Sequence, residues 1–174
     1  MRVPIRLGLA LITAAATVAL GAEASRPEHD IADGNQLELI YFGGSHCGPC
    51  KSPRMREAVL KAKAIFAERA AAQHRPYSTT GVALDLSPEA GIEYLKEVGP
   101  FDQVISGRSW FNQAVLDWIV PYPDAIAGIP QIVIVERRMT LDKEGKARFE
   151  RPKVLARIPG TGIPLWVDAG AQTD

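Results

Sequence analysis

The sequence has few cysteine and histidine residues. Its 174 residues include two cysteines, Cys47 and Cys50, and three histidines, His29, His46 and His74. A structural zinc site needs four ligands, and zinc-binding chains usually repeat the cysteine pair further along the sequence. Only His46 adjoins the pair, and the other histidines are scattered. We therefore expect no metal site.

The sequence also lacks an excess of charge of either sign. It has 20 basic and 20 acidic residues and a formal net charge of zero. This balance gives no reason to expect nucleic acid or an anionic membrane surface as a partner. The hydrophobic fraction of 47% and the charged fraction of 23% are ordinary for a globular protein, so disorder is not expected. We expect one domain with a substantial core.

The long uncharged run in the sequence lies at its N-terminus. Arg2 and Arg6 precede a mostly apolar stretch over residues 7–22, and a small-x-small pattern ends at Ala24. This is the order of a bacterial secretory signal, and the stretch is shorter than the roughly 20 residues of a membrane-spanning helix. An uncleaved membrane anchor is the alternative. We expect a signal peptide over 1–24, a polar leader over 25–35, a folded domain over 36–174, and a location in the oxidising periplasm.

The apolar pattern of the remaining chain predicts alternating strands and helices. Short apolar runs predict strands at 37–42, 82–86, 131–135 and 154–158, the last two joined by a turn around 142–145. Apolar spacings of three and four residues predict helices at 49–72, 87–98 and 108–120. In the last of these, Trp110, Phe111 and Trp118 fall on one side. The order of elements predicts an α/β sandwich with a central mixed sheet.

The two cysteines lie where the first predicted strand leads into the first predicted helix, in the segment SHCGPCK. At such a junction, unpaired N–H groups and the helix dipole stabilise a thiolate on Cys47, the form that attacks disulfides. Gly48 and Pro49 form a tight turn that lets Cys50 face Cys47. A purely structural bridge is less expected, because closing so short a loop restricts the unfolded chain little. The pattern favours a reversible redox pair.

The segment from Cys47 to Lys51, directly after a strand ending in Tyr-Phe, resembles the active site of the thioredoxins. A second point of resemblance is Gly128-Ile129-Pro130 before the strand QIVIV. In thioredoxin-fold proteins a cis proline here lies against the cysteines, and the backbone before it binds substrate as an added strand. The resemblance covers about 37–86 and 128–158. It implies catalysis by Cys47 and Cys50, substrate binding by Ile129 and Pro130, and modulation by His46, Gly48, Pro49 and Lys51.

The sequence departs from the thioredoxin pattern in several places. His46 replaces the usual tryptophan, and is interpreted either as a support for the charge on the reactive sulfur or as a surface residue. Tyr41 stands where thioredoxins have a buried aspartate that assists the second cysteine. Copper chaperones of a related fold use a downstream histidine, and none follows His74. Residues 87–127 are a predicted helical insertion, either ordinary core or one wall of a substrate groove.

These features predict a periplasmic thiol–disulfide oxidoreductase of the thioredoxin-like superfamily that reduces disulfides of extracytoplasmic proteins through Cys47 and Cys50. No cofactor is expected. The alternatives are a disulfide oxidant or isomerase that uses the same cysteines, and a non-enzymatic peptide-binding module on the same scaffold. The expected partners are a disulfide-containing substrate protein and a membrane thiol carrier as electron donor. We expect a monomer.

Overall fold

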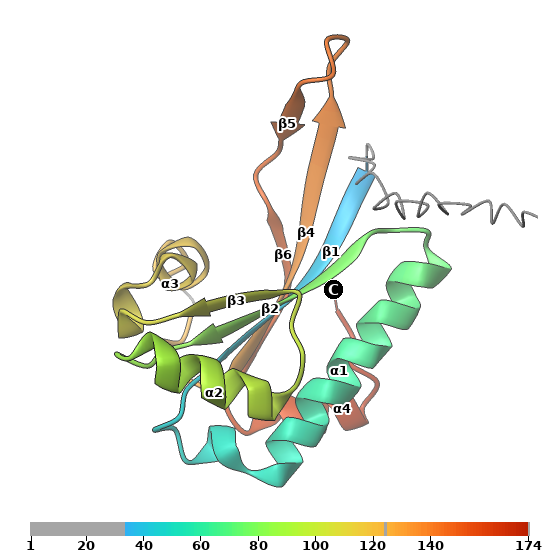
Figure 1. Cartoon of the computed structure of the whole chain (residues 1–174). Coiled ribbons are helices and arrows are strands. Elements are labelled where there is room, and N and C mark those ends of the chain that lie inside the picture. Colours follow the sequence, from blue (N-terminus) through green and yellow to red (C-terminus); the bar gives the residue numbers. More distant parts are fainter. Residues whose placement is uncertain (1–33, 124, 174) are drawn as a thin grey trace, which may run out of the picture. The chain divides into compact units, whose positions relative to one another are not determined.

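The computed structural model describes residues 34–123 and 125–173 and shows a mixed sheet with helices on both faces (Figure 1). The strands are β1 (Gly34–Gly43), β2 (Tyr77–Ala83), β3 (Gln103–Ser106), β4 (Gln131–Leu141), β5 (Ala147–Phe149) and β6 (Lys153–Pro159). Strands β1, β2 and β3 run parallel, whereas β4 is antiparallel to β1, β5 and β6. The spatial order is β3-β2-β1-β4-β5, with β6 also paired to β4. The predicted signal peptide and most of the predicted leader lie outside the described residues.

The helices divide between the two faces of the sheet. They are α1 (Pro53–Ala72), α2 (Pro88–Val98), α3 (Gln113–Trp118) and α4 (Gly162–Asp168), with short 3-10 helices η1 (Pro49–Lys51) and η2 (Ser109–Phe111). Buried residues of α1, α2 and α4 pack in one apolar cluster, and those of α3 pack in another on the opposite face. None of the helices in the described part of the chain has the length and apolar character needed to cross a bilayer.

The central strand β1 is buried on both faces, which explains its continuous apolar run. Leu39 and Tyr41 belong to the cluster under α1, α2 and α4, and Ile40 and Phe42 belong to the cluster under α3. All four are at most 1% exposed. Alternate residues of a strand face opposite sides, so a strand between two helical layers needs apolar residues at every position. The predicted α/β sandwich with a central mixed sheet is confirmed.

Several predicted elements have nearly the predicted positions, but β2 does not. Helix α2, the beginning of β4, the turn at Asp142–Gly145 and strand β6 agree with the sequence analysis. The second strand was predicted at 82–86 and in fact ends at Ala83. Its first half contains Thr79 and Thr80, which are buried. Their hydroxyls donate hydrogen bonds to Asp102 and Glu38, so these polar groups keep partners inside the protein. An apolar pattern does not reveal a strand buried through polar contacts.

The segment 87–127 is not wholly helical, contrary to the prediction. It contains β3, an edge strand that pairs in parallel with β2. Gln103 and Val104 are exposed, so this short strand lacks a clear apolar pattern. The predicted helix at 108–120 is also divided, because Asn112 has an extended backbone and its side chain accepts the N–H of Val115 to cap α3.

This division changes the position of the aromatic residues. Trp118 packs into the core, as do Ala114 and Val115. Trp110 and Phe111 lie on η2 instead and are 37% and 74% exposed. The prediction that Trp110, Phe111 and Trp118 fall on one side of a single helix was therefore wrong. Helical spacing places residues on one face only where the helix is continuous.

Candidate redox site

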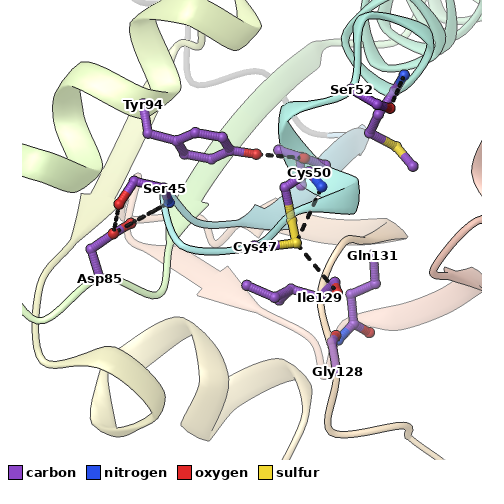
Figure 2. Close-up of a disulfide and its surroundings, with 11 residues drawn as sticks. Ser45, Cys47, Cys50, Ser52, Asp85, Tyr94, Gly128, Ile129 and Gln131 are labelled. Carbon is purple, nitrogen blue, oxygen red and sulfur yellow. Dashed lines mark hydrogen bonds between the residues drawn. A yellow bond between two sulfur atoms is a disulfide. The ribbon is translucent and has the colours of Figure 1, made fainter.

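Cys47 and Cys50 form a disulfide in the turn that follows β1, and their Cα atoms are 5.2 Å apart (Figure 2). Strand β1 ends at Gly43, and residues 44–48 lead into η1. Cys47 is partly exposed, whereas Cys50 is fully buried among the residues of the cluster under α1. The two sulfurs are thus joined but differ in access, since Cys47 can be reached from solvent and Cys50 cannot.

The first long helix begins later than predicted, at Pro53 rather than near Pro49. Ser52 has an extended backbone (φ −66°, ψ 139°) between η1 and α1. A residue before proline is disfavoured in the helical conformation, and proline is well suited to the first position of a helix. The Ser52 side chain caps α1 by accepting the N–H of Met55 at 3.1 Å. The cysteines therefore precede α1 and do not belong to its first turn.

A backbone N–H supports the sulfur of Cys47 in place of the first turn of α1. The N–H of Cys50 points at Cys47 Sγ, with 3.2 Å between the two heavy atoms. An N–H in this position stabilises negative charge on the sulfur when the disulfide is reduced. On its other side, Cys47 Sγ lies 3.6 Å from the carbonyl oxygen of Ile129. Figure 2 shows both contacts as dashed lines.

Ile129 lies beside the disulfide, with its carbonyl oxygen 3.6 Å from Cys47 Sγ, and Pro130 follows it in the chain. The peptide bond between them is cis, and Pro130 is buried. The segment is held from both sides: the side chain of Gln131 donates to the carbonyl of Gly128 at 2.7 Å, and the N–H of Gly160 donates to the carbonyl of Pro130 at 2.7 Å. These bonds fix the backbone that runs past Cys47 Sγ.

The residues predicted to modulate the site lie at its surface. The His46 side chain is 93% exposed, and its Nε2 lies 4.0 Å from Oδ1 of Asp85. Gly48, Pro49 and Lys51 are also exposed. Gly48 has an ordinary right-handed backbone (φ −54°), and no atom lies within 4 Å of the position of an added Cβ. The turn itself therefore does not require glycine.

Tyr41, at the position of the missing acid, makes a buried pair with Tyr94. Their hydroxyl oxygens are 2.7 Å apart, and both residues pack in the same cluster as Cys50. Burial, followed by the influence of Tyr94, raises the pKa of Tyr41 far above its ordinary value. Burial raises the pKa of Tyr94 to about 12. Both phenols keep their protons at neutral pH, so neither can accept a proton from Cys50.

The sequence analysis missed one polar residue at this site, Asp85. It is 2% exposed, and both of its carboxylate oxygens accept the N–H of Ser45, at 3.1 and 3.2 Å. The Ser45 hydroxyl also donates to Oδ1. Asp85 was assigned to the interior of a predicted strand. A signal was nevertheless present, because an acidic residue at the carboxyl end of a strand beside β1 lies at the same sheet edge as the cysteine turn.

A hollow of about 370 Å³ lies beside Cys47. Its lining comes from the cysteine turn, the end of β2 and the segment before β4, and consists of Gly44, His46, Cys47, Pro49, Leu84, Asp85 and Ile129. The predicted insertion, 87–127, contributes none of these residues. Both Cys47 and Asp85 therefore line this hollow.

No protein-family model and no curated protein matches the chain. Among solved structures, a thiol:disulfide interchange protein from a Bacteroides species is similar at 21% identity and a TM-score of 0.46, over 79% of this chain and 72% of that one. A thiol-disulfide oxidoreductase from Bacteroides fragilis is 20% identical, with a TM-score of 0.40 over 70% and 71% of the two chains. ScoI of Arabidopsis thaliana, with copper bound, is 15% identical, with a TM-score of 0.39 over 77% and 81%.

Proposed function

We propose that this protein is a periplasmic thiol–disulfide oxidoreductase that reduces disulfides of other extracytoplasmic proteins. The observation that carries this proposal is the Cys47–Cys50 disulfide, in which one sulfur faces a hollow and the other is fully buried. Such a difference in access suits a pair in which one cysteine attacks and the other resolves.

The reaction begins with the reduced pair. The Cys47 thiolate attacks one sulfur of a substrate disulfide, which forms a bond between Cys47 and that sulfur and releases the other substrate sulfur as a thiolate. Cys50 then loses its proton and attacks Cys47 Sγ, which releases the second substrate thiolate. Two electrons have passed to the substrate, whose thiolates take up protons, and the protein is left with the Cys47–Cys50 disulfide.

Neither tyrosine of the buried pair can accept the proton that Cys50 loses. Tyr41 and Tyr94 hold their own protons, as their raised pKa values require. Water that reaches Cys50 only while Cys47 is bonded to the substrate is therefore the proposed acceptor. This makes the resolving step slower than in a protein with a buried carboxylate beside the second cysteine.

The proposed docking surface for the substrate is the backbone around Ile129 and Pro130. The Ile129 carbonyl lies beside Cys47 Sγ, and the bonds from Gln131 and Gly160 hold this segment in place. An extended substrate would pair with this backbone as an added strand, with its disulfide over Cys47. A side chain next to the substrate cysteine would occupy the hollow.

The proposed direction requires a source of electrons. A protein that ends each cycle as a disulfide needs a thiol donor, and a membrane thiol carrier is the proposed one. The N-terminal sequence pattern over residues 1–24 supports export to the periplasm. We propose that the chain acts there as a monomer.

Reduction of insulin by dithiothreitol tests the proposal. The wild-type protein is expected to accelerate the reaction, and a Cys47→Ala variant is expected to lose this effect. A peptide-binding module without redox activity would leave the rate unchanged, and that result would contradict the proposed function. Thioredoxin has a potential near −270 mV and the oxidant DsbA one near −120 mV, a difference of about 7 kcal/mol, so titration with glutathione separates a reductant from an oxidant.

A further inference from the structure

The hollow beside Cys47 contains a buried carboxylate that the exchange steps above do not use. Asp85 accepts three hydrogen bonds from Ser45, two from its backbone N–H and one from its hydroxyl. Figure 2 shows the two side chains together on the approach to the cysteine turn. The Asp85 carboxylate and Cys47 line the same hollow.

We infer that Asp85 is a positioning residue that keeps the Cys47–Cys50 couple reducing. This inference rests on the proposed function and names a residue that supports its reducing direction. A thiolate on Cys47 and the Asp85 carboxylate are like charges in one hollow, so Asp85 destabilises the thiolate. Disulfide oxidants are strong because their reduced form is stabilised. A residue that destabilises the reduced form does the opposite and favours the transfer of electrons to a substrate.

Positive groups near the site oppose this effect only weakly. Among the described residues, the nearest group to Asp85 that can carry a positive charge is the imidazole of His46. Its Nε2 lies 4.0 Å from Oδ1 of Asp85. Its side chain is 93% exposed, so water and salt screen its charge. Lys51 is also exposed, and Arg56 is paired with Glu97 at 2.5 Å. Asp85 is 2% exposed, so water and salt screen its charge less than they screen the charge of the exposed His46.

Asp102 provides a control with the same hydrogen-bond pattern but in an exposed position, whereas Asp85 is buried. It accepts the backbone N–H and the hydroxyl of Thr79, both at 2.8 Å, and so repeats the pattern that Asp85 makes with Ser45. Thr79 lies near the beginning of β2, whereas Asp85 follows the end of that strand. Asp102 does not line the hollow beside Cys47. Its replacement removes a similar carboxylate at a distance from the cysteines.

The test is the equilibrium of the purified full chain with glutathione, in which the protein disulfide and two reduced glutathione molecules give the dithiol and one oxidised glutathione. Asp85→Asn removes the charge but keeps an oxygen that accepts from Ser45. We expect this variant to shift the equilibrium toward the dithiol by about tenfold, or about 30 mV. Alkylation of Cys47 at pH 6 should also become faster. Asp102→Asn should stay within twofold of wild type, and Asp85→Glu should restore the wild-type equilibrium.

The outcomes separate this inference from the proposed function. If Asp85→Asn does not fold, Asp85→Ser replaces it as a smaller neutral acceptor with the same expected shift. An unchanged equilibrium in the neutral variant, or a shift toward the disulfide, would overturn the role of Asp85 even if insulin reduction were normal. The shift should persist in a His46→Gln background, and its loss there would also overturn the inference. A wild-type protein that never exchanges with glutathione would instead refute the proposed function.

Discussion

The hydroxyl oxygens of Tyr41 and Tyr94 lie 2.7 Å apart in the same buried cluster as Cys50. This pair occupies the place where the thioredoxin pattern has an acid, and it stays neutral because burial opposes ionisation of either phenol. The buried cluster that contains Cys50 therefore includes a hydrogen bond between two uncharged groups. The pair makes the stability of the protein sensitive to alkaline pH.

The first prediction concerns this alkaline sensitivity. Burial raises the pKa of Tyr94 from the ordinary tyrosine value of 10.0 to about 12 in the folded protein. Between these values the unfolded chain releases the proton and the folded chain keeps it, so the free energy of unfolding falls as pH rises. Each such group contributes a slope of up to about 1.4 kcal/mol per pH unit. Urea denaturation at a series of pH values from about 9 to about 12 measures this slope.

Tyr94→Phe provides the control for this prediction. The variant loses the hydrogen bond to Tyr41 and is expected to be less stable at pH 7 by about 1 kcal/mol. Its stability should fall less steeply above pH 10 than that of the wild type, because one of the two buried phenols is absent. Parallel pH curves for the two proteins would contradict the account.

The second prediction compares two glycines near the cysteines. A Cβ at Gly43 would overlap the hydroxyls of both Tyr94 and Tyr41, the latter at 2.9 Å, whereas nothing lies within 4 Å of one at Gly48. Gly43→Ala should therefore destabilise the protein by about 1–3 kcal/mol through overpacking. Gly48→Ala has a compatible backbone and should be neutral or stabilising by up to about 1 kcal/mol. Thermal denaturation of both variants measures the difference, and equal effects would contradict the packing described here.

The third prediction concerns the serine between η1 and α1. Ser52→Ala removes the cap on Met55 and should lower stability by about 1 kcal/mol. Ser87→Ala removes the equivalent cap of α2, in which Ser87 accepts the N–H of Ala90 at 3.2 Å, and should lower it by a similar amount. Only the first variant should alter the rate of Cys47 alkylation, because Ser52 adjoins the η1 turn that positions the Cys50 N–H. Equal alkylation rates in the two variants would show that the cap does not affect the site.

The fourth prediction tests the different positions of the aromatic residues in 109–118. Phe111 is 74% exposed and Trp118 is 7% exposed. Phe111→Ser should change the free energy of unfolding by no more than about 0.5 kcal/mol, as at an ordinary surface position. Trp118→Ala should lower it by about 3–5 kcal/mol, because it leaves a cavity between α3 and the sheet. A large loss with Phe111→Ser would mean that η2 packs more deeply than described.

Local order along the chain predicted the cysteine turn after an apolar strand. The position of Ile129 beside Cys47 was predicted only from the resemblance of these two segments to the thioredoxins. Asp85 was not found, because its role depends on which strand lies beside β1, and the apolar pattern had placed β2 too far along the chain. Strand β3 was missed because an exposed edge strand carries little apolar signal.

The most direct test of the account is the capture of mixed disulfides by a Cys50→Ala variant. Without Cys50 the bond between Cys47 and a substrate sulfur cannot be resolved from within the protein. The account predicts that adducts with substrate proteins accumulate, that thiol reductants release them, and that Cys47→Ala forms none. If Cys50→Ala forms no adducts while its Cys47 still reacts with alkylating agents, thiol–disulfide exchange is not the function of this site.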